Sequence, residues 1–561
     1  MADETNLAKK LKEDERRDIA VQICRDYNTD TRTRLPWEQR RNSFYKLWIA
    51  QMDPKTSPWP GASNVCLPLL ATACNQFHAR SYTAFTAPNH SLYVIPVEKN
   101  DIAHAKAVEQ FMNWQISFDI ENYEDEVDKM CLGVPLNGGA GKKLHFDIEA
   151  EKPVTEYVPM MDLVVPYRTR SFETARRITQ RLRRHYDELA MKADERYIDF
   201  DKVSNVSADT EENEPPIETT KDEIEGEVLE QEENPKLILE AHKNLKILDD
   251  KKPSPYIATV DYDSQTLLRL TSRIASVGGQ ETVLNHFVDY HFIPNPEGFY
   301  SFGFGHFLEH LNLMANTAFN QIFDAGRLSN QPFGFYGRRA GIRRKTIDLH
   351  PGKMTEVEDA SQIFFPSMQR LDQTLFQVLG LIQQYVEQYT STSDYLLGRE
   401  ARGTKTPTAT GTLAIIEQGL VLYSTMIKRL FRSQKKEFRL LYKLNQIGLP
   451  KKQQYFVLGT TDPNKIAFPE IKRKDFDAHM HVIPVGDPTY ASRQQRKQEA
   501  QELLAATLSN PLVVNMGKVQ VLNPAAVWNA YKNLYETYER RDVMNLLPPE
   551  PPPAPMAPEA E

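Results

Sequence analysis

Cysteine is scarce in this sequence, and long apolar runs are missing. Four cysteines stand among 561 residues, none of them in a CxxC pair, namely Cys24, Cys66, Cys74 and Cys131. So few thiols exclude a disulfide framework and suit a reducing compartment. No apolar run approaches the ~20 residues of a membrane-spanning helix, and the charged stretch MADETNLAKKLKEDERRD contains no signal-peptide core. We therefore expect a soluble intracellular protein or a particle component, with no membrane partner.

Strong net charge is also missing. The net charge is −8, with 68 basic and 76 acidic side chains. So mild an imbalance argues against wholesale wrapping of nucleic acid, but it leaves room for a basic surface that faces DNA locally. Hydrophobic residues make up 40% and charged residues 26% of the chain. That composition is typical of a globular protein with roughly three or four domains, or with one large mixed domain.

Signatures of catalysis are absent. The stretch LNGGAGKK fails the P-loop pattern, because Leu136 stands at the first glycine position and Lys143 replaces Ser/Thr; it predicts a turn between a helix and a strand. His306 and His310 have zincin spacing, but the order HFLEH displaces the glutamate that HEXXH needs. No G-x-S-x-G elbow is present. We expect no catalytic residue, no metal site and no cofactor.

Two amphipathic helical patterns dominate the middle of the chain. Residues 305–323 and 368–389 carry apolar side chains at spacings of three and four. A basic, glycine-punctuated segment of β type lies between them, and a polar loop rich in Gly and Thr follows them. Such a hairpin of helices with a basic tip suits a ring or tube of many copies better than an active site.

Other patterns complete an α+β fold that is mostly helical. We expect two helices within residues 5–52, and further helices at 67–85, 104–130, 171–195 and 412–445. Strand-like segments lie at 143–148, 155–165 and 453–485, and residues 256–270 predict a hairpin.

Residues 209–233 contain twelve acidic residues and one lysine. Such a segment predicts a solvated, mobile insertion, which we place at 205–235. Two interpretations stay open: a surface insertion with no partner, or an arm that docks on a basic partner.

Several strings resemble those of tailed-bacteriophage portal proteins, the head-to-tail connectors, and they occur in that family's order. They are PWPGASNVCLPL (58–69), the segment MDLVVPYRTRSFETARRITQRLRRHYDEL (161–189), the helix-bearing segment 295–332, DYLLGREARGTKTPTATGTLAIIEQG (394–419) and VIPVGDPTYASRQQRKQEAQELL (482–504). The acidic insertion and the proline-rich tail have no counterpart.

The resemblance implies a portal-type fold with wing, stem, clip and crown regions that assembles into a ring. Carried onto this chain, the regions are a wing (1–303), two stem helices (304–330 and 364–390) around a clip (331–363), a tunnel loop (391–411), a connecting helix and β segment (412–487), crown helices (488–547) and a disordered proline-rich tail (548–561).

The resemblance also implies a function. The ring, usually a homododecamer, would sit at the capsid vertex of the virion after assembly in the host cytoplasm. Double-stranded DNA would pass through it without sequence-specific contacts during packaging and ejection. Its partners would be the terminase large subunit, the major capsid protein, the scaffolding protein and head-tail adaptor or tail proteins.

Two basic sets are the candidate contact residues. Sparse cations in the tunnel loop would touch phosphates transiently without stopping DNA movement; these are Arg399, Arg402 and Lys405. The clip cations would contact the motor, an adaptor or DNA, or else pair with acidic neighbours between subunits; these are Arg338, Arg339, Arg343, Arg344 and Lys345. The alternatives to a portal are another head-tail connector component, such as an adaptor, and a metal-dependent nucleic-acid enzyme.

Overall fold

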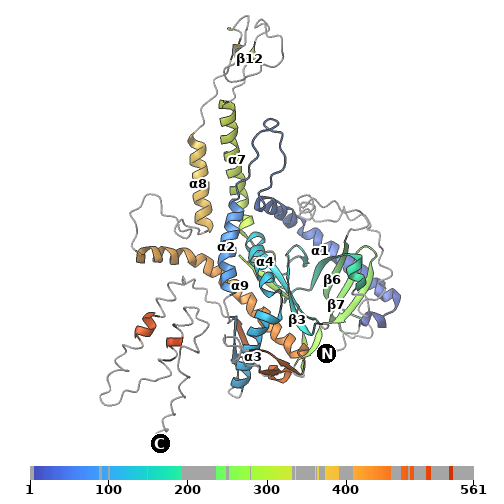
Figure 1. Cartoon of the computed structure of the whole chain (residues 1–561). Coiled ribbons are helices and arrows are strands. Elements are labelled where there is room, and N and C mark those ends of the chain that lie inside the picture. Colours follow the sequence, from blue (N-terminus) through green and yellow to red (C-terminus); the bar gives the residue numbers. More distant parts are fainter. Residues whose placement is uncertain are drawn as a thin grey trace, which may run out of the picture.

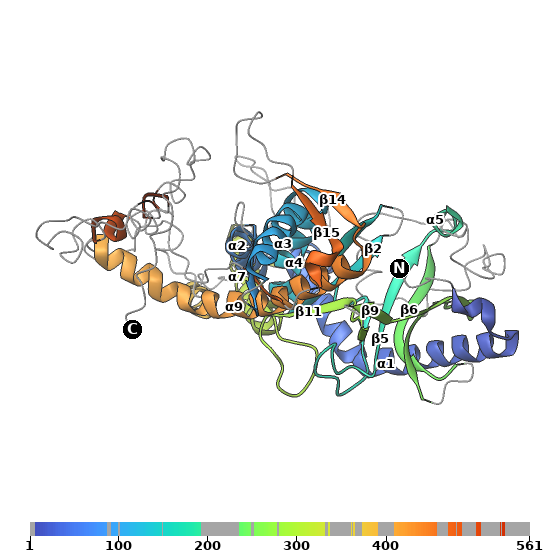
Figure 2. The same ribbon diagram turned by 90° about the horizontal axis from the view of Figure 1, so that it is seen from below.

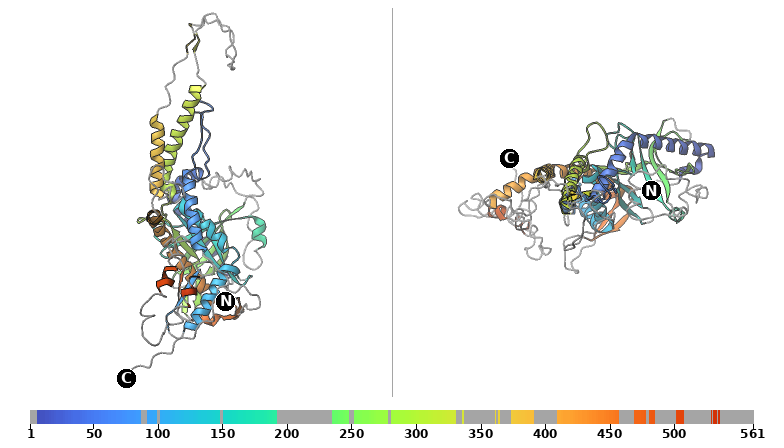
Figure 3. Two further views of the ribbon diagram at one scale, coloured as in Figure 1. Left: turned by 60° about the vertical axis from the view of Figure 1, so that its left-hand side comes forward. Right: turned by 90° about the horizontal axis from the view of Figure 1, so that it is seen from above.

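The chain has a two-part shape, a broad body and a long helical rod that projects from it (Figure 1, Figure 3). The computed structural model describes residues 6–86, 91–98, 101–147, 150–191, 235–247, 252–277, 280–330, 335–336, 361, 363–364, 373–390, 409–456, 469–477, 480–484, 501–506, 528, 530–532 and 534. Helices and strands mix throughout these residues, which confirms the α+β class.

One half of the body is a five-stranded antiparallel sheet. Its spatial order is β4-β5-β6-β7-β8, with strands at Leu163–Val164, Arg177–Arg184, Lys236–Leu245, Ser254–Asp261 and Thr266–Ser272. The hairpin predicted for 256–270 is confirmed as β7 and β8, with Asp261 paired to Thr266. The long helix α1, Glu13–Trp48, crosses this sheet (Figure 2), and a short 3-10 turn, η1 (Leu7–Lys10), leads into it. Apolar residues of α1 and of the sheet form one continuous core, for example Ile23, Tyr27, Leu239 and Val260.

The other half of the body surrounds a three-stranded sheet of order β11-β2-β3, formed by Phe287–His291, Gly139–Asp147 and Lys152–Val158. Helices α2 (Leu69–Phe85), α4 (Tyr123–Asn137) and α9 (Ala409–Gly448) pack with this sheet in the largest hydrophobic core. The predicted helix-to-strand turn is confirmed: α4 ends at Asn137, and Gly138 turns into β2 with a φ of 87°. A side chain there would meet the Ser301 carbonyl oxygen at 2.2 Å, so only glycine fits.

Small elements complete the body. A two-stranded sheet joins distant parts of the chain, pairing β1 (Leu92–Pro96) with β16 (Met480–Pro484). Nearby lie β14 (Lys452–Gln454), β15 (Glu470–Lys472) and the 3-10 turn η9 (Arg473–Phe476). A β ribbon of β9 (Ile274–Val277) and β10 (Gln280–Val283) borders α9, and α5 (Tyr186–Met191) follows β5. The β structure predicted for 453–485 is thereby confirmed in its described parts.

The rod consists of α7, Phe304–Asn330, and α8, Gln373–Thr390. Both amphipathic patterns therefore form helices, within the described residues. Beyond them the short strands β12 (Phe335–Tyr336) and β13 (Ile363–Phe364) pair with each other at the far end of the rod (Figure 1). Phe364 thus lies in a strand and not in a helix, because its backbone pairs with Phe335.

Three further sequence predictions are wrong. Two helices are expected within residues 5–52, but the structure has one long helix, α1, which continues through Pro36 and is preceded only by the 3-10 turn η1. The helix expected at 104–130 is broken into α3 (Ile102–Trp114), a π-helical turn η3 (Gln115–Asp119) and α4. In η3 the amide of Gln115 exchanges two hydrogen bonds with Asn445 of α9, at 3.0 and 2.7 Å.

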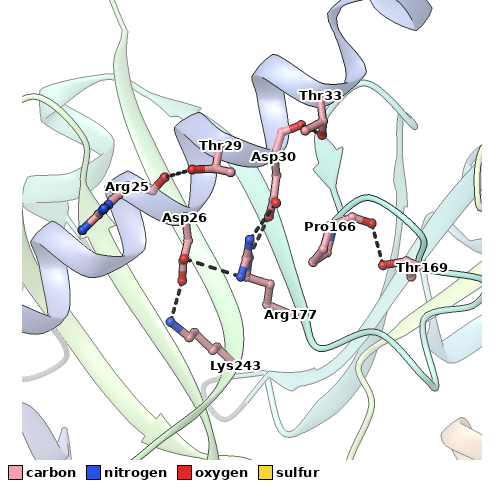
Figure 4. A network of polar contacts seen from close by, with 9 residues as sticks. All are labelled: Arg25, Asp26, Thr29, Asp30, Thr33, Pro166, Thr169, Arg177 and Lys243. Atoms are coloured by element: carbon pink, nitrogen blue, oxygen red, sulfur yellow. Dashed lines mark hydrogen bonds and ion pairs between the residues drawn. The ribbon is translucent and has the colours of Figure 1, made fainter.

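The charged helix expected at 171–195 is instead the strand β5 followed by α5. Its arginines are not a solvated helical face. Arg177 is held by two hydrogen bonds of 2.7 Å to the Asp30 carboxylate of α1, and its guanidinium also lies 3.4 Å from Asp26 (Figure 4). Lys243 of β6 approaches the same Asp26 at 2.5 Å. Asp26 and Asp30 of α1 therefore neutralise Arg177 of β5 and Lys243 of β6.

Candidate functional site

The rod is the part of the chain with the most unusual surface. Apolar side chains stay exposed along both helices, namely Leu313, Met314 and Phe323 of α7 and Phe376, Leu381, Tyr385 and Tyr389 of α8. The two helices touch through Phe307 and Tyr389, whose ring centroids lie 5.1 Å apart. A monomer that keeps so many large apolar residues in water presents an interaction surface.

An extended segment runs beside α7 and is held by its side chains. We call residues 61–68, which lead from the α1 side into α2, the strap. Four polar residues of α7 at spacings of four, Asn312, Asn316, Asn320 and Asp324, form what we call the amide ladder; all four are buried. Residues four apart lie on one face of a helix, so the ladder presents a single row of polar groups to the strap.

The ladder binds the backbone of the strap. Side-chain oxygens of Asp324, Asn320 and Asn316 accept from the N–H groups of Ser63, Val65 and Leu67 at 2.7, 2.8 and 2.8 Å. In return, Asn320 and Asn312 donate to the carbonyl oxygens of Val65 and Leu67, both at 3.0 Å. Asn312 also accepts from the Leu70 N–H at 3.1 Å, in the first turn of α2, where backbone donors lack helical partners.

A second joint fixes the base of the rod to α1. Arg40 donates to the Glu309 carboxylate at 3.2 Å and to the His306 carbonyl oxygen at 3.1 Å. The His306 ring packs edge-on against Phe44, with centroids 4.8 Å apart, and burial lowers its pKa to about 4. The HFLEH residues His306 and Glu309 therefore serve helix packing.

The helix α9 is anchored in the body by a buried ion pair. Lys142 of β2 lies 2.8 Å from Glu437 of α9, and both side chains are essentially inaccessible to water. The Tyr290 hydroxyl donates to the other Glu437 oxygen, and the Lys142 ammonium lies 4.4 Å from the centre of the Tyr123 ring. A buried charge pair is tolerated where further hydrogen bonds complete it, as they do here.

A further pair lies on the same side of α9. Lys436 contacts both Asp289 and Glu173 at 3.2 Å. Burial would raise the pKa of Asp289, but the hydrogen bond from His291 and the charge of Lys436 hold that pKa well below its usual range. Asp289 is thus ionised, and α9 is tied to β11 at its middle.

The two basic sets predicted as contact residues lie outside the described residues. This holds for the tunnel-loop set, Arg399, Arg402 and Lys405, and for the clip set, Arg338, Arg339, Arg343, Arg344 and Lys345. The acidic insertion and most of the proposed crown and tail lie outside them as well. Their predicted roles stay predictions.

In the described part of the chain, no group of three or more His, Cys, Asp and Glu side chains is placed to hold a metal ion. None of the described helices combines the length and the apolar composition that crossing a membrane requires.

Comparison with protein families gives a match over most of the chain. The family described as phage SU10 portal protein matches residues 142–561. The chain belongs to this portal protein family. A comparison with curated proteins found no match.

The portal match begins at Lys142, in the middle of strand β2. Helix α1, the strap and α2 precede it, whereas the amide ladder and Glu437 lie within it. The ladder therefore connects the N-terminal elements with the matched region, whereas both residues of the Lys142–Glu437 pair lie within that region. The ladder was missed at the sequence level, although its signal was present as Asn or Asp at every fourth residue from 312 to 324.

Proposed function

We propose that this portal-family chain forms a closed ring, built from twelve copies, at one vertex of a phage capsid. Double-stranded DNA would be packaged and ejected through its central channel. The family assignment supports a portal role, and one observation carries the assembly: the rod exposes large apolar side chains along both of its helices.

The exposed rod residues support side-by-side packing of copies. In an isolated chain Met314 of α7 is 56% exposed and Tyr385 of α8 is 60% exposed. At ~25 cal/mol per Å², covering such residues stabilises an interface substantially. A contact between different faces of identical subunits closes into a ring when the rotation permits.

We assign the regions of the chain accordingly. The wing comprises residues 1–303, the stem 304–330 and 365–390, the clip 331–364 with the paired strand residue Phe364 included, and the tunnel loop 391–411. Residues 412–487 connect wing and crown, and the crown comprises 488–547. The rod that α7 and α8 form supports the stem assignment, because α7 alone would span ~40 Å at ~1.5 Å per residue.

The basic sets keep the roles proposed from the sequence. Arg399, Arg402 and Lys405 would contact DNA phosphates in the channel, and the cluster from Arg338 to Lys345 would contact the motor, an adaptor or DNA. A small number of cations favours weak contacts that ignore base sequence. The ring itself would be non-enzymatic, with ATP hydrolysis performed by the terminase large subunit docked on the clip.

The wing would contact the major capsid protein and the scaffolding protein, and the clip would later receive head-tail adaptors. Negative-stain electron microscopy with mass photometry of the purified chain tests the proposal. Rings with a central hole and a mass of about 770 kDa, twelve times the 64.5 kDa chain, are expected. A globular low-order oligomer that cleaves DNA with a divalent metal would overturn it.

A further inference from the structure

One face of α9 carries a continuous row of cations. We call Lys428, Arg432, Lys435, Arg439 and Lys443 the basic row; their spacings of four, three, four and four place them on one side of the helix. Lys428, Arg432 and Arg439 are exposed, and the other two are half-buried. The row covers sixteen residues, and it is ~22 Å long at ~1.5 Å per step.

The row is not neutralised by the described part of the chain. Lys436, one position off the row, forms ion pairs with Glu173 and Asp289, whereas the five row residues form none among the described residues. The helix dipole stabilises cations only in the last turn of a helix. Because α9 continues to Gly448, most of the row lies before that turn, and the dipole does not explain why the cations are there.

A shallow cavity of about 180 Å³ lies beside the C-terminal half of the row. Arg439 and Lys443 line one side of it, and apolar side chains line the other, including Val283, Leu284 and Val288. Val283 is 46% exposed. The surface therefore fits a chain that carries many negative charges with occasional apolar side chains.

The acidic segment 209–233 has that composition. Its twelve acidic residues and single lysine are interspersed with Ile217, Ile224, Val228 and Leu229. We propose that the basic row is the docking site of this segment in the same chain. The aliphatic side chains would enter the cavity while the carboxylates face the row.

The length of the connecting chain permits this contact. The segment ends two residues before Pro235, and β6 begins at Lys236. From β6, Glu240 reaches Lys143 of β2 at 2.8 Å, and the adjacent Lys142 reaches Glu437 of α9 at 2.8 Å. The row therefore lies on the order of 30 Å from the start of β6, whereas twenty residues of chain can span ~66 Å.

Nucleic acid is the less favoured occupant. Apolar side chains line the cavity beside the row, including Val283 and Leu284; the aliphatic residues of the acidic segment can cover them, whereas a phosphate backbone cannot. A segment of the same chain also reaches the row at a high effective concentration, on the order of mM for short flexible linkers. DNA would have to compete with it.

Zero-length carbodiimide crosslinking of the full chain, read by mass spectrometry, tests the proposal. Lys428, Lys435 and Lys443 supply amines, and the segment supplies carboxylates. We expect links between them at about 50 mM salt that fall roughly fivefold at about 500 mM, because screening shortens the Debye length. Mixing of isotope-labelled and unlabelled chains separates links within one chain from links between copies.

A charge-reversed variant sharpens the test. Arg432→Glu with Arg439→Glu keeps all three reactive lysines, so a loss of links reports loss of docking. Arg17→Glu with Arg25→Glu, both exposed on α1, makes the same charge change elsewhere and should leave the links intact. Lys106, exposed on α3, controls for nonspecific reaction.

Three results would overturn the proposal: no links from the row, links from Lys106 at equal yield, or links only between copies. A DNA duplex could also protect the row lysines from crosslinking. If that protection were the same after deletion of residues 209–233, the row would be a nucleic-acid surface instead.

Discussion

Asn320 of α7 binds the backbone of Val65 twice. Its amide oxygen accepts from the Val65 N–H at 2.8 Å, and its amide nitrogen donates to the Val65 carbonyl oxygen at 3.0 Å. One side chain thus completes both backbone groups of one strap residue, as a neighbouring strand would. The contact is specific for an extended backbone and indifferent to the side chain that it carries.

Replacement of the most buried ladder residue should release the strap. Asn312→Leu leaves the Leu67 carbonyl and the Leu70 N–H without their partners, and we expect a loss of about 2–3 kcal/mol in the free energy of unfolding. Chemical denaturation measures the loss, and limited proteolysis within residues 53–67 should accelerate. Gln321→Leu, on the exposed face of α7, is the matched control. Equal losses in both variants would contradict the role of the ladder.

Removal of one partner of the buried pair should destabilise the body more than removal of both. Lys142→Met leaves the Glu437 carboxylate buried without a countercharge, at a cost of about 3–5 kcal/mol. Adding Glu437→Gln to that variant should restore more than half of the loss. Denaturation of the single and double variants forms the cycle, and strictly additive losses would show that the two residues do not interact.

The bidentate contact between β5 and α1 should matter more than its surface neighbours. Arg177→Met leaves the carboxylates of Asp30 and Asp26 without this cation, and we expect the free energy of unfolding to fall by about 2–4 kcal/mol. Arg176→Met changes the adjacent exposed arginine and should cost under about 0.5 kcal/mol. If the two variants melted at the same temperature, the contact would not stabilise the fold.

Acid should destabilise the protein before its carboxylates titrate. Burial lowers the pKa of His242 to about 4 and that of His286 to about 3, against ~6.5 in an unfolded chain. Between about pH 6.5 and 4 the two histidines are protonated in the unfolded state and neutral in the folded state. The free energy of unfolding therefore falls as the pH falls, by on the order of 3 kcal/mol per histidine.

Denaturation across this pH range, compared with a His242→Gln and His286→Asn double variant, measures the effect. The double variant should show a flatter profile. His104→Gln, at an exposed position, should leave the slope unchanged. His306, whose pKa is also lowered to about 4, will leave some slope in the double variant. A slope as steep in the double variant as in the parent would assign the pH dependence to other groups.

A charge on the exposed face of α8 should block assembly without unfolding the chain. Leu381→Glu places a carboxylate where we propose contact with the next copy, and rings should give way to monomers in mass photometry. Gln383→Glu introduces the same charge at another exposed position of α8. Circular dichroism should be unchanged in both. Intact rings from Leu381→Glu would exclude this face from the interface.

Strong periodicity made the long helices predictable. The amphipathic patterns of α7, α8 and α9 extend over several turns, and the hairpin of β7 and β8 has a turn with matching strands on each side. The candidate cations of the tunnel loop and clip rest on the family resemblance, and the described residues do not include them.

Tertiary partners decided the elements that sequence reasoning missed. Strand β5 has the charge pattern of a solvated helix, but Arg177 is neutralised by Asp26 and Asp30, which lie about 150 residues earlier on α1. In the sequence, the ladder residues interrupt the apolar stripe of α7 with polar side chains. The local pattern does not show that the backbone of a distant segment binds Asn312 and Asn316. Such pairings across the chain carry no local signature.

The contact groups of the ladder and of the strap repeat at slightly different axial distances. Four residues of helix advance ~6.0 Å, whereas two residues of extended chain advance ~6.6 Å, so each rung adds a mismatch of about half an ångström. The helix face also turns by ~40° per rung. Three ladder residues bind strap N–H groups two residues apart, those of Ser63, Val65 and Leu67. The fourth, Asn312, accepts instead from the N–H of Leu70, which already belongs to α2. At the other end of the strap, Arg327 of α7 donates to the Gly61 carbonyl oxygen at 2.7 Å. The matched spacing therefore holds over three contacts only, and it fixes the rod and α2 relative to each other at one position.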